Sequence, residues 1–554
     1  MTYLLINHLM ERLTMTSITR ILLNNVTFRL EQTPVAFARI NLPFADAKYG
    51  IVGKNGVGKT TLMRLLSGDL TPDSGSIQRF GTIITVPQSH DEFGEQATVS
   101  DVLGVTDILA ALNRISHGSI DEHDYELASN QWNIEQRIED TLTQFGLWPI
   151  SLNTPFSQLS GGQKTKVLLA KTMIFPADFL LFDEPTNNLD KTARDVLYNY
   201  IDNATKGMAI ISHDRTLLNR LDCIIEINNL GIDTYGGNYD FYCEQKQLKQ
   251  QAIAHEIQAR SESLAKTKQT TQTRMERHQQ NEARGRKEKR AQISAKGRYD
   301  KIAIKSKKGR SENTNRRIRT QADKQLQNAQ HLLADAKAKR EVDEAIAIDL
   351  AATHVPTSKI VLKIETLCFQ YPASEPLLRD FELQIIGPER VAISGPNGCG
   401  KSTLIKLIRK ERLPQRGKIH CGVEVSAYLD QTVSFLNPMK TIVENFLVLN
   451  PECTPNDAYA TLAAFKFRNK DAEKRSDTLS GGERMRAGLA ITLMAKHPPQ
   501  LIILDEPTNH LDIASIRAIE SALSNYQGAI LAVSHDEVFL QNIGITRTIY
   551  MNEA

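Results

Sequence analysis

The 554-residue sequence predicts an α/β fold in which one domain occurs twice, with a long α-helical hairpin between the two copies. Three motifs recur in the same order along the chain, as expected of an internal duplication. GKNGVGKTTL near position 53 returns as GPNGCGKSTL near 395, LSGGQ at 159 as LSGGE at 479, and LLFDEPTNNLD at 180 as IILDEPTNHLD at 502. The segment from 244 to 355 has no proline and is rich in helix-forming residues, which predicts long helices.

The repeat also predicts where the domains lie. The predicted parts are an N-terminal extension at 1–16, a first domain at 17–243, a basic helical linker at 244–355 and a second domain at 356–554. Equivalent positions are offset by 343 at Gln88 and Gln431, but by 320 at Ser160 and Ser480. The first domain therefore carries 23 extra residues, which we expect in the polar, helix-like run at 107–144.

Composition limits the class of protein. No stretch of the chain approaches the roughly 18 uninterrupted apolar residues of a membrane span. The N-terminus has neither a basic start nor a small-residue cleavage site, so it is not typical of a secretory signal, and Met15 is a credible alternative start. The six cysteines are scattered, without the paired spacing of a zinc or iron–sulfur site, which suits a reducing cytoplasm.

Charge is distributed unevenly along the chain. The stretch 244–340 contains 26 basic and 10 acidic residues, a net charge of +16, whereas the remainder carries −13. Such asymmetry favours a polyanionic partner, although a solvated charged coiled coil is the simpler alternative. Gly285, Gly297 and Gly309 are expected to loosen the middle, where the chain would turn back between two helices of about 40 residues and about 60 Å each. The predicted tip, 274–319, has 17 basic and 5 acidic residues and so suits phosphate backbones.

Both copies contain a phosphate-binding P-loop at every defined position of the motif. Each follows an apolar run and precedes a helical pattern, so the backbone N–H groups, the lysine and the hydroxyl are expected to bind phosphates and Mg²⁺. A single match could be a chance glycine-rich turn, but two in this context could not. The candidate binding residues are Gly53, Lys54, Asn55, Gly56, Val57, Gly58, Lys59, Thr60 and Thr61, and Gly395, Pro396, Asn397, Gly398, Cys399, Gly400, Lys401, Ser402 and Thr403.

Two apolar runs each end in Asp-Glu, the pattern of a buried parallel strand that ends at the ligand-binding edge of a sheet. Asp183 and Asp505 are expected to hold Mg²⁺ through water. Glu184 and Glu506 are expected to orient and deprotonate the water that attacks the γ-phosphate. A strand that leads into a solvated turn is the alternative for one copy alone, and the upstream P-loops argue against it.

The LSGGQ and LSGGE motifs each lead into a helical stretch. Ser160 and Ser480 are natural N-caps, and the glycines that follow would allow an anion to approach the helix N-terminus. Ordinary helix capping is the alternative reading. The candidate anion-binding residues are Ser160, Gly161 and Gly162, and Ser480, Gly481 and Gly482.

The motif order, completed in each half by a glutamine and by ISHD or VSHD, resembles ABC-type ATPases. Two P-loop ABC-type nucleotide-binding domains on one chain, without a membrane part and with a charged linker, resemble the ABC-F family, whose members act on ribosomes. The resemblance implies that each ATP lies between the P-loop of one cassette and the signature of the other. Site one would combine Lys59, Glu184 and His213 with Ser480 and Gly482; site two would combine Lys401, Glu506 and His535 with Ser160 and Gly162.

The resemblance also assigns further roles. Gln88 and Gln431 would join Thr60, Ser402, Asp183 and Asp505 at the metal, and would act with the glutamates and histidines in catalysis. Tyr371 would stack on adenine, whereas Leu30 stands at that place in the first copy.

The implied function is ATP hydrolysis to ADP and phosphate by a monomer that pairs its own cassettes on the ribosome. The linker tip at 274–319 would contact rRNA and tRNA. Two other functions stay open, an ATP-binding subunit with a separate membrane transporter as partner and a DNA-repair ATPase. The basic linker disfavours the first, and the missing zinc cysteines disfavour the second. A housekeeping translation factor and an antibiotic-resistance protein fit the sequence equally.

Overall fold

The structure is a computed structural model that describes residues 19–29, 37–88, 93–94, 96–228, 231–295, 301–338, 354–372, 376–430 and 432–551, with the backbone alone for parts of 278–319. The expectations for Met15, Leu30, Gln431 and the glycine at 297 fall outside these residues. Contacts divide the chain into one unit of 1–240 and 344–554 and a second unit of 241–343.

The first cassette is built on a mainly parallel sheet whose buried strands end at a common edge. Its strand order is β5 (Ile83–Val86), β6 (Phe179–Asp183), β7 (Gly207–Ile211), β3 (Lys48–Gly53), β8 (Cys223–Asn228) and β9 (Gly231–Gly236), of which β9 is antiparallel. A smaller antiparallel sheet contains β2 (Phe37–Ala45), β1 (Thr19–Phe28) and β4 (Ser74–Arg79). The helices are α2 (Lys59–Ser67), α3 (Val99–Leu103), α4 (Thr106–Ser116), α5 (Glu122–Ala128), α6 (Ile134–Gln144), α7 (Gly161–Ile174), α8 (Lys191–Asn203) and α9 (Arg215–Leu218).

The second cassette repeats this plan. Its parallel sheet has the order β14 (Ser426–Leu429), β15 (Leu501–Asp505), β16 (Ala529–Val533), β12 (Arg390–Ser394) and β17 (Arg547–Tyr550). The antiparallel sheet contains β11 (Pro376–Ile386), β10 (Ile360–Gln370) and β13 (Arg416–Cys421). The helices are α12 (Lys401–Ile408), α13 (Ile442–Leu449), α14 (Pro455–Ala464), α15 (Gly481–Leu493), α16 (Ile513–Ser524) and α17 (Glu537–Asn542). The predicted duplicated α/β class is confirmed.

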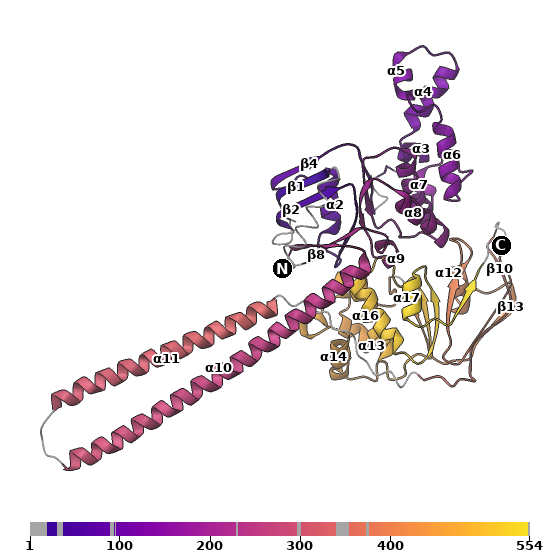
Figure 1. Cartoon of the computed structure of the whole chain (residues 1–554). Helices are drawn as coiled ribbons and strands as arrows, with labels where there is room; N and C mark the ends of the chain where they lie inside the picture. The colour runs from indigo at the N-terminus through magenta and orange to yellow at the C-terminus, as the bar shows by residue number, and fades with distance from the viewer. Residues whose placement is uncertain are drawn as a thin grey trace. The chain divides into compact units, whose positions relative to one another are not determined.

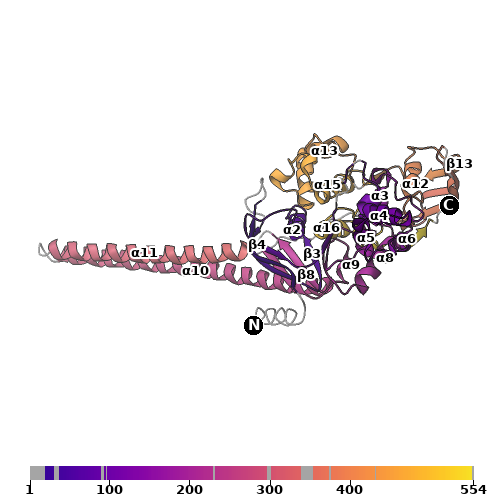
Figure 2. The ribbon, with the colours of Figure 1, turned by 90° about the horizontal axis from the view of Figure 1, so that it is seen from above.

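Apolar packing joins the two sheets of each cassette. The P-loop helix α2 packs between them in the first cassette, where Leu62 and Leu65 are fully buried with Ile21 of β1 and Ile51 of β3. Burying such a side chain is worth about 2 kcal/mol, so this core fixes the helix whose N-terminus forms the phosphate site. Figures 1 and 2 show the two views of these elements.

The extra residues of the first cassette form α4 and α5. The second cassette has α13 in the place of α3 and α14 in the place of α6, because Phe145 and Phe465 follow α6 and α14 at the offset of 320. The insertion therefore lies before α6, in the first part of the run expected at 107–144. Arg114 of α4 binds the buried carboxylate of Asp124 of α5 through Nε at 2.9 Å, which holds this helical pair together.

The linker forms the two expected helices. Two of the three glycines that were expected to loosen the turn lie within these helices instead, so that part of the prediction is wrong. Helix α10 (Tyr239–Ala295) has 57 residues and α11 (Lys301–Ala338) has 38, and the two run side by side as a hairpin (Figures 1 and 2). Gly285 lies within α10 and Gly309 within α11. The cost of one glycine in a helix, about 1 kcal/mol, is small enough for the helix-forming neighbours to offset.

Candidate functional site

Each P-loop connects the end of a buried strand to the start of a helix. β3 ends at Gly53, and α2 begins at Lys59 after Gly58, whose φ of 107° is left-handed and therefore suits glycine. Gly56 has a φ of 79°, and a Cβ added there would meet no atom within 4 Å, so the loop leaves open space above it. Gly398 of the second P-loop has the same property, with a φ of 90°.

The P-loop lysines point back across their own loops. Lys59 Nζ donates to Gly53 O at 2.8 Å and to Asn55 Oδ1 at 3.2 Å. Lys401 Nζ donates to Gly395 O at 2.7 Å and to Pro396 O at 2.9 Å. Burial lowers the pKa of Lys59, and the carboxylate of Glu184 opposes that shift. A buried ammonium whose partners are neutral carbonyls provides a strong site for a phosphate oxygen.

Both predicted glutamates have left-handed backbones directly after a parallel strand. Glu184 follows β6 with a φ of 52°, and Glu506 follows β15 with a φ of 47°. Their N–H groups donate to the neighbouring strands, to Ile211 O at 2.9 Å and to Val533 O at 2.8 Å. These bonds support a conformation that is costly for a non-glycine residue and fix the direction of each side chain.

Each glutamate lies beside the predicted histidine of the same cassette. His213 Nε2 is 3.3 Å from Glu184 Oε1, and His535 Nε2 is 3.5 Å from Glu506 Oε1. Burial raises the pKa of Glu184, and it raises the pKa of Glu506 to about 7 against the opposing charge of Arg194. Burial also lowers the pKa of each histidine to about 3, so both imidazoles are neutral at pH 7. His213 Nδ1 and His535 Nε2 are buried without a hydrogen-bond partner.

The predicted metal residues of the first cassette meet in one pocket of about 400 Å³. Thr60 hydrogen bonds to Asp183, whose Oδ1 is buried without a partner, and burial raises the pKa of this carboxyl. Hydroxyl, amide and carboxylate oxygens are ligands that suit Mg²⁺, so the residues present fit the ion. The lining residues are Asn55, Gly56, Gly58, Lys59, Thr60, Thr61, Gln88, Asp183, Glu184, Ile211, His213 and His510.

The metal residues of the second cassette have an additional neighbour. Ser402 hydrogen bonds to Asp505, and Tyr428 Oη donates to Asp505 Oδ2 at 3.3 Å. Thr85 stands at the position equivalent to Tyr428 in the first cassette. The tyrosine is a functional candidate that the motifs did not indicate.

The predicted adenine contact is placed beside the second P-loop helix. Tyr371 Oη is 3.2 Å from Thr403 Oγ1, and its ring meets Phe369 edge-on with centroids 5.0 Å apart. The guanidinium of Arg412 lies 5.7 Å from the ring centroid of Tyr371. The ring is thus held close to the loop by contacts on several sides.

The signature motifs cap helices in both cassettes. Ser160 Oγ accepts from Gln163 N, and Gln163 Oε1 accepts from Ser160 N at 3.0 Å, which completes a capping box at the start of α7. Ser480 and Glu483 make the same arrangement at α15. Gly161 and Gly162, like Gly481 and Gly482, therefore form the first turn of each helix, where free N–H groups face outward.

The cassettes contact each other through their P-loops. Asn55 Nδ2 donates to His510 O at 3.0 Å, and Asn55 N donates to Asp512 Oδ2 at 3.1 Å. Asn397 Nδ2 donates to Asn188 O at 2.8 Å in the converse direction. Each P-loop thus contacts the loop that follows the Asp-Glu strand of the opposite cassette.

The signature of the first cassette lies beside the second P-loop. A Cβ added at Gly162 would lie 3.1 Å from Asn397 Nδ2. Around Gly482 the nearest atoms belong to Ser515 and Leu511 of the same cassette. The opposite cassette therefore approaches site one through His510 and Asp512, which sequence reasoning did not assign.

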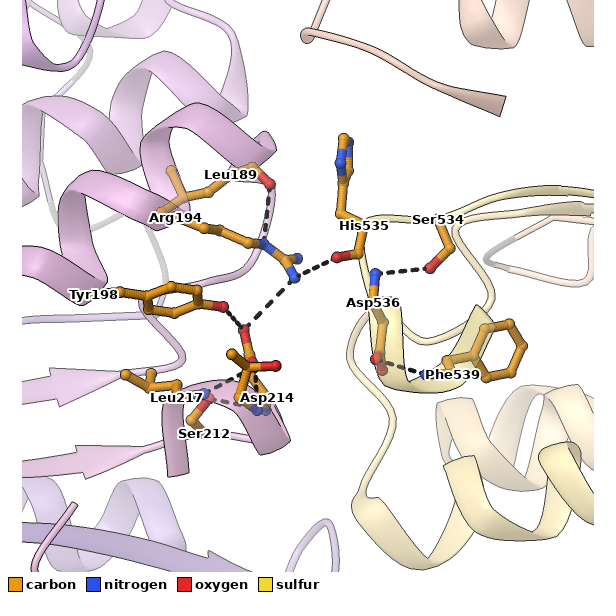
Figure 3. Close-up of polar contacts among 11 residues, drawn as sticks. Leu189, Arg194, Tyr198, Ser212, Asp214, Leu217, Ser534, His535, Asp536 and Phe539 are labelled. Carbon is orange, nitrogen blue, oxygen red and sulfur yellow. Dashed lines mark hydrogen bonds and ion pairs between the residues drawn. The ribbon is translucent and has the colours of Figure 1, made fainter. Parts of the chain in front are cut away.

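Arg194 is another residue that the motifs missed. From α8 of the first cassette, its Nη1 donates to His535 O of the second cassette at 3.2 Å and lies 3.6 Å from Asp214 Oδ2 (Figure 3). Tyr198 Oη donates to the same Asp214 oxygen at 2.5 Å. The position equivalent to Arg194 in the second cassette is Ile516, so the repeat gave no signal for this contact.

Comparisons with known proteins decide the family. The family model described as ABC transporter matches residues 41–187 and 378–509. The ATP-binding protein Uup of Haemophilus influenzae is 31% identical over an alignment that covers 89% of this chain and 72% of the relative. The ABC transporter F family member 5 of Arabidopsis thaliana is 28% identical, with coverage of 91% and 71%. The chain belongs to the ABC-F family.

Other matches agree with the ABC-F assignment. The energy-dependent translational throttle protein EttA of Mycobacterium tuberculosis is 28% identical to this ABC-F chain, with coverage of 90% and 85%. A solved structure named RNase-L Inhibitor has the same fold, with a TM-score of 0.56, 17% identity and coverage of 95% and 87%. Within the described ranges, the ABC-F chain has no helix long and apolar enough to cross a membrane.

Proposed function

We propose that this ABC-F chain binds two ATP molecules between its cassettes and hydrolyses them to ADP and phosphate. The crossed P-loop contacts carry the proposal: Asn55 binds His510 of the second cassette, and Asn397 binds Asn188 of the first. A nucleotide on either P-loop would lie where the opposite cassette already contacts the loop. ATP would then add contacts to both cassettes and favour their closure.

The side chains divide the chemistry between them. Lys59 and Lys401 would bind phosphate oxygens, and the histidines with free ring nitrogens would contact the γ-phosphate. Bound Mg²⁺, held by Thr60, Gln88 and Asp183 at site one and by Ser402, Gln431 and Asp505 at site two, would neutralise phosphate charge. Glu184 and Glu506 would orient the attacking water and accept its proton. Glu184 is buried and the side chain of Glu506 is 19% exposed, and the backbone conformation of each glutamate fixes the direction of its side chain.

We further propose that the ribosome is the partner and that the linker contacts rRNA and tRNA. The net charge of +16 on 244–340 supports this, because clustered lysine and arginine bind phosphate backbones with release of counterions. The relative EttA is named for an action on translation. Regulation of translation and displacement of a ribosome-bound antibiotic would both use such a linker.

One variant tests both parts of the proposal. Glu184→Gln with Glu506→Gln should bind ATP but release phosphate at least about 100-fold more slowly, because an amide cannot accept the water's proton. With ATP it should co-sediment with ribosomes, and less so as salt rises.

Removing 274–319 from that variant should abolish co-sedimentation while ATP binding stays. Near-normal phosphate release would refute the catalytic assignment. Unchanged co-sedimentation of the deleted protein would refute the linker assignment and leave the ATPase proposal standing.

A further inference from the structure

Among the described residues, three contacts between the cassettes each join a cation of the first cassette to an acceptor of the second. Arg215 of α9 donates to both oxygens of Glu520 of α16, at 2.8 and 3.2 Å, and the two side chains are 8% and 9% exposed. Lys191 Nζ lies 2.7 Å from Glu537 Oε1 at the more exposed border. Arg194 also donates from the first cassette to the second, to the His535 carbonyl (Figure 3).

The internal repeat shows that these contacts have no mirror image. At the repeat offset of 322, each residue of the first cassette has an equivalent in the second. The equivalent pairs are Lys191 and Ile513, Arg194 and Ile516, Tyr198 and Glu520, and Arg215 and Glu537. At three of these positions the first cassette has a cation where the second has isoleucine or glutamate, and at the fourth it has Tyr198 where the second has Glu520. When a first cassette pairs with a second cassette, Lys191 meets Glu537 and Arg215 meets Glu520, so opposite charges face each other.

A pairing of two identical cassettes in the same geometry would oppose like charges. Two first cassettes would bring Lys191 of one copy against Arg215 of the other. Two second cassettes would bring Glu537 against Glu520. Truncating or opposing one partner of a buried ion pair is strongly destabilising, because it leaves a buried charge without compensation. Repulsion of this kind excludes wrong partners more effectively than attraction alone.

We propose that Lys191 and Arg215 on one side, with Glu520 and Glu537 on the other, form a charge-coded surface. It selects the second cassette as the partner of the first and rejects a second copy of the same cassette. The carboxylate of Glu520 is matched by a bidentate guanidinium, the geometry with the highest specificity among ion pairs. The proposal concerns pairing and does not depend on ATP hydrolysis or on the ribosome.

Charge reversal in the full-length chain tests the surface. Glu520→Arg should oppose Arg215 within the chain and, at the same time, complement Glu537 of a second copy. Amide exchange in α9 and α16 should become faster by about tenfold or more, a factor that corresponds to about 1.4 kcal/mol. Sedimentation velocity should reveal a dimer whose fraction rises with protein concentration, whereas the unmodified chain stays monomeric.

The double swap Arg215→Glu with Glu520→Arg separates charge complementarity from general damage to the fold. It should recover slow exchange in α9 and α16 and return the chain to a monomer, because the intrachain pair is restored with inverted sign and the two cassettes on one chain meet at high effective concentration. Glu452→Arg is the matched control, since it reverses the same charge in an exposed pair with Lys496 inside one cassette, and it should stay monomeric.

Glu537→Arg provides the same test at an exposed position, 64% of whose side chain is accessible, should Glu520→Arg not fold. Monomers with unchanged exchange in both single variants would overturn the proposal. A dimer already formed by the unmodified chain through its cassettes would overturn it as well.

Discussion

Arg194 distinguishes the two sites at the level of single residues. Its guanidinium lies between the Asp214 carboxylate and the His535 carbonyl, whereas Ile516 at the equivalent position has no polar group to offer. Thus Arg194 of the first cassette donates a hydrogen bond to the loop that carries His535, the histidine of the second site.

We expect Arg194→Leu to slow hydrolysis at site two more than at site one. Asp214 would keep Tyr198 and the backbone of α9 as partners, but the His535 carbonyl would lose this donor. Phosphate release should fall by about tenfold in a Glu184→Gln background, where site two alone would be active, and by much less in a Glu506→Gln background. Lys191→Leu serves as the control for weakened pairing. Equal losses in both backgrounds would show that Arg194 acts on pairing alone.

The motifs predicted the identity of the site residues better than their surroundings. The P-loop and the Asp-Glu pattern predicted Lys59 and Asp183, the family resemblance implied His213, and the structure brings all three to one pocket. Asn55 was predicted only as part of the P-loop, although its side chain reaches His510. Such a contact depends on how two distant surfaces meet, and no periodicity in the sequence carries that information.

Helix extent was the main error at the level of elements. Glycine was treated as a marker of the turn, but Gly285 and Gly309 lie within α10 and α11. A long run of Lys, Arg, Gln and Glu contributes enough propensity to continue through one weak residue, so local composition outweighs a single breaker. The insertion was predicted in the right segment, but α6 proved to be part of the repeated plan.

We expect Gly285→Ala and Gly309→Ala to stabilise the linker helices. Each substitution removes the backbone entropy of glycine and should add about 0.5–1 kcal/mol of helix stability. Helical circular dichroism at 222 nm, followed with temperature, should show a later loss of signal, and ATP binding should not change. A pair of Gly→Ser substitutions should give a smaller gain. Loss of helicity in the alanine variants would contradict the helical placement of these glycines.

At the scale of the whole molecule, the first two residues of α10 lie in the unit that contains both cassettes. Tyr239, the first residue of α10, receives a hydrogen bond from Arg517 of α16 at 3.0 Å, and Asp240 N donates to Asn219 Oδ1 at 3.0 Å. The base of α10 therefore contacts both cassettes. A change in how the cassettes pair would alter these contacts where the linker begins.

If ribosomes prefer the linker orientation of the closed cassettes, they must tighten ATP binding by the same factor by which ATP tightens ribosome binding. We expect a gain in ATP affinity of about 5- to 100-fold for the Glu184→Gln, Glu506→Gln protein on adding ribosomes. Titration with a fluorescent ATP analogue, with and without ribosomes, measures this affinity. The protein that lacks 274–319 is the control. An affinity that ribosomes leave unchanged would mean that the linker docks without coupling to the cassettes.

The unequal charges at equivalent positions of the two cassettes also bear on the history of the chain. An ancestral gene duplication begins with two identical halves, which must be able to pair with themselves. Here Arg215 stands where the second half has Glu537, and Tyr198 stands where it has Glu520. On the proposed pairing, we expect a chimaera that joins two copies of either half to place like charges together and to pair its halves poorly. Neither half would then be able to replace the other, and the duplication would be irreversible.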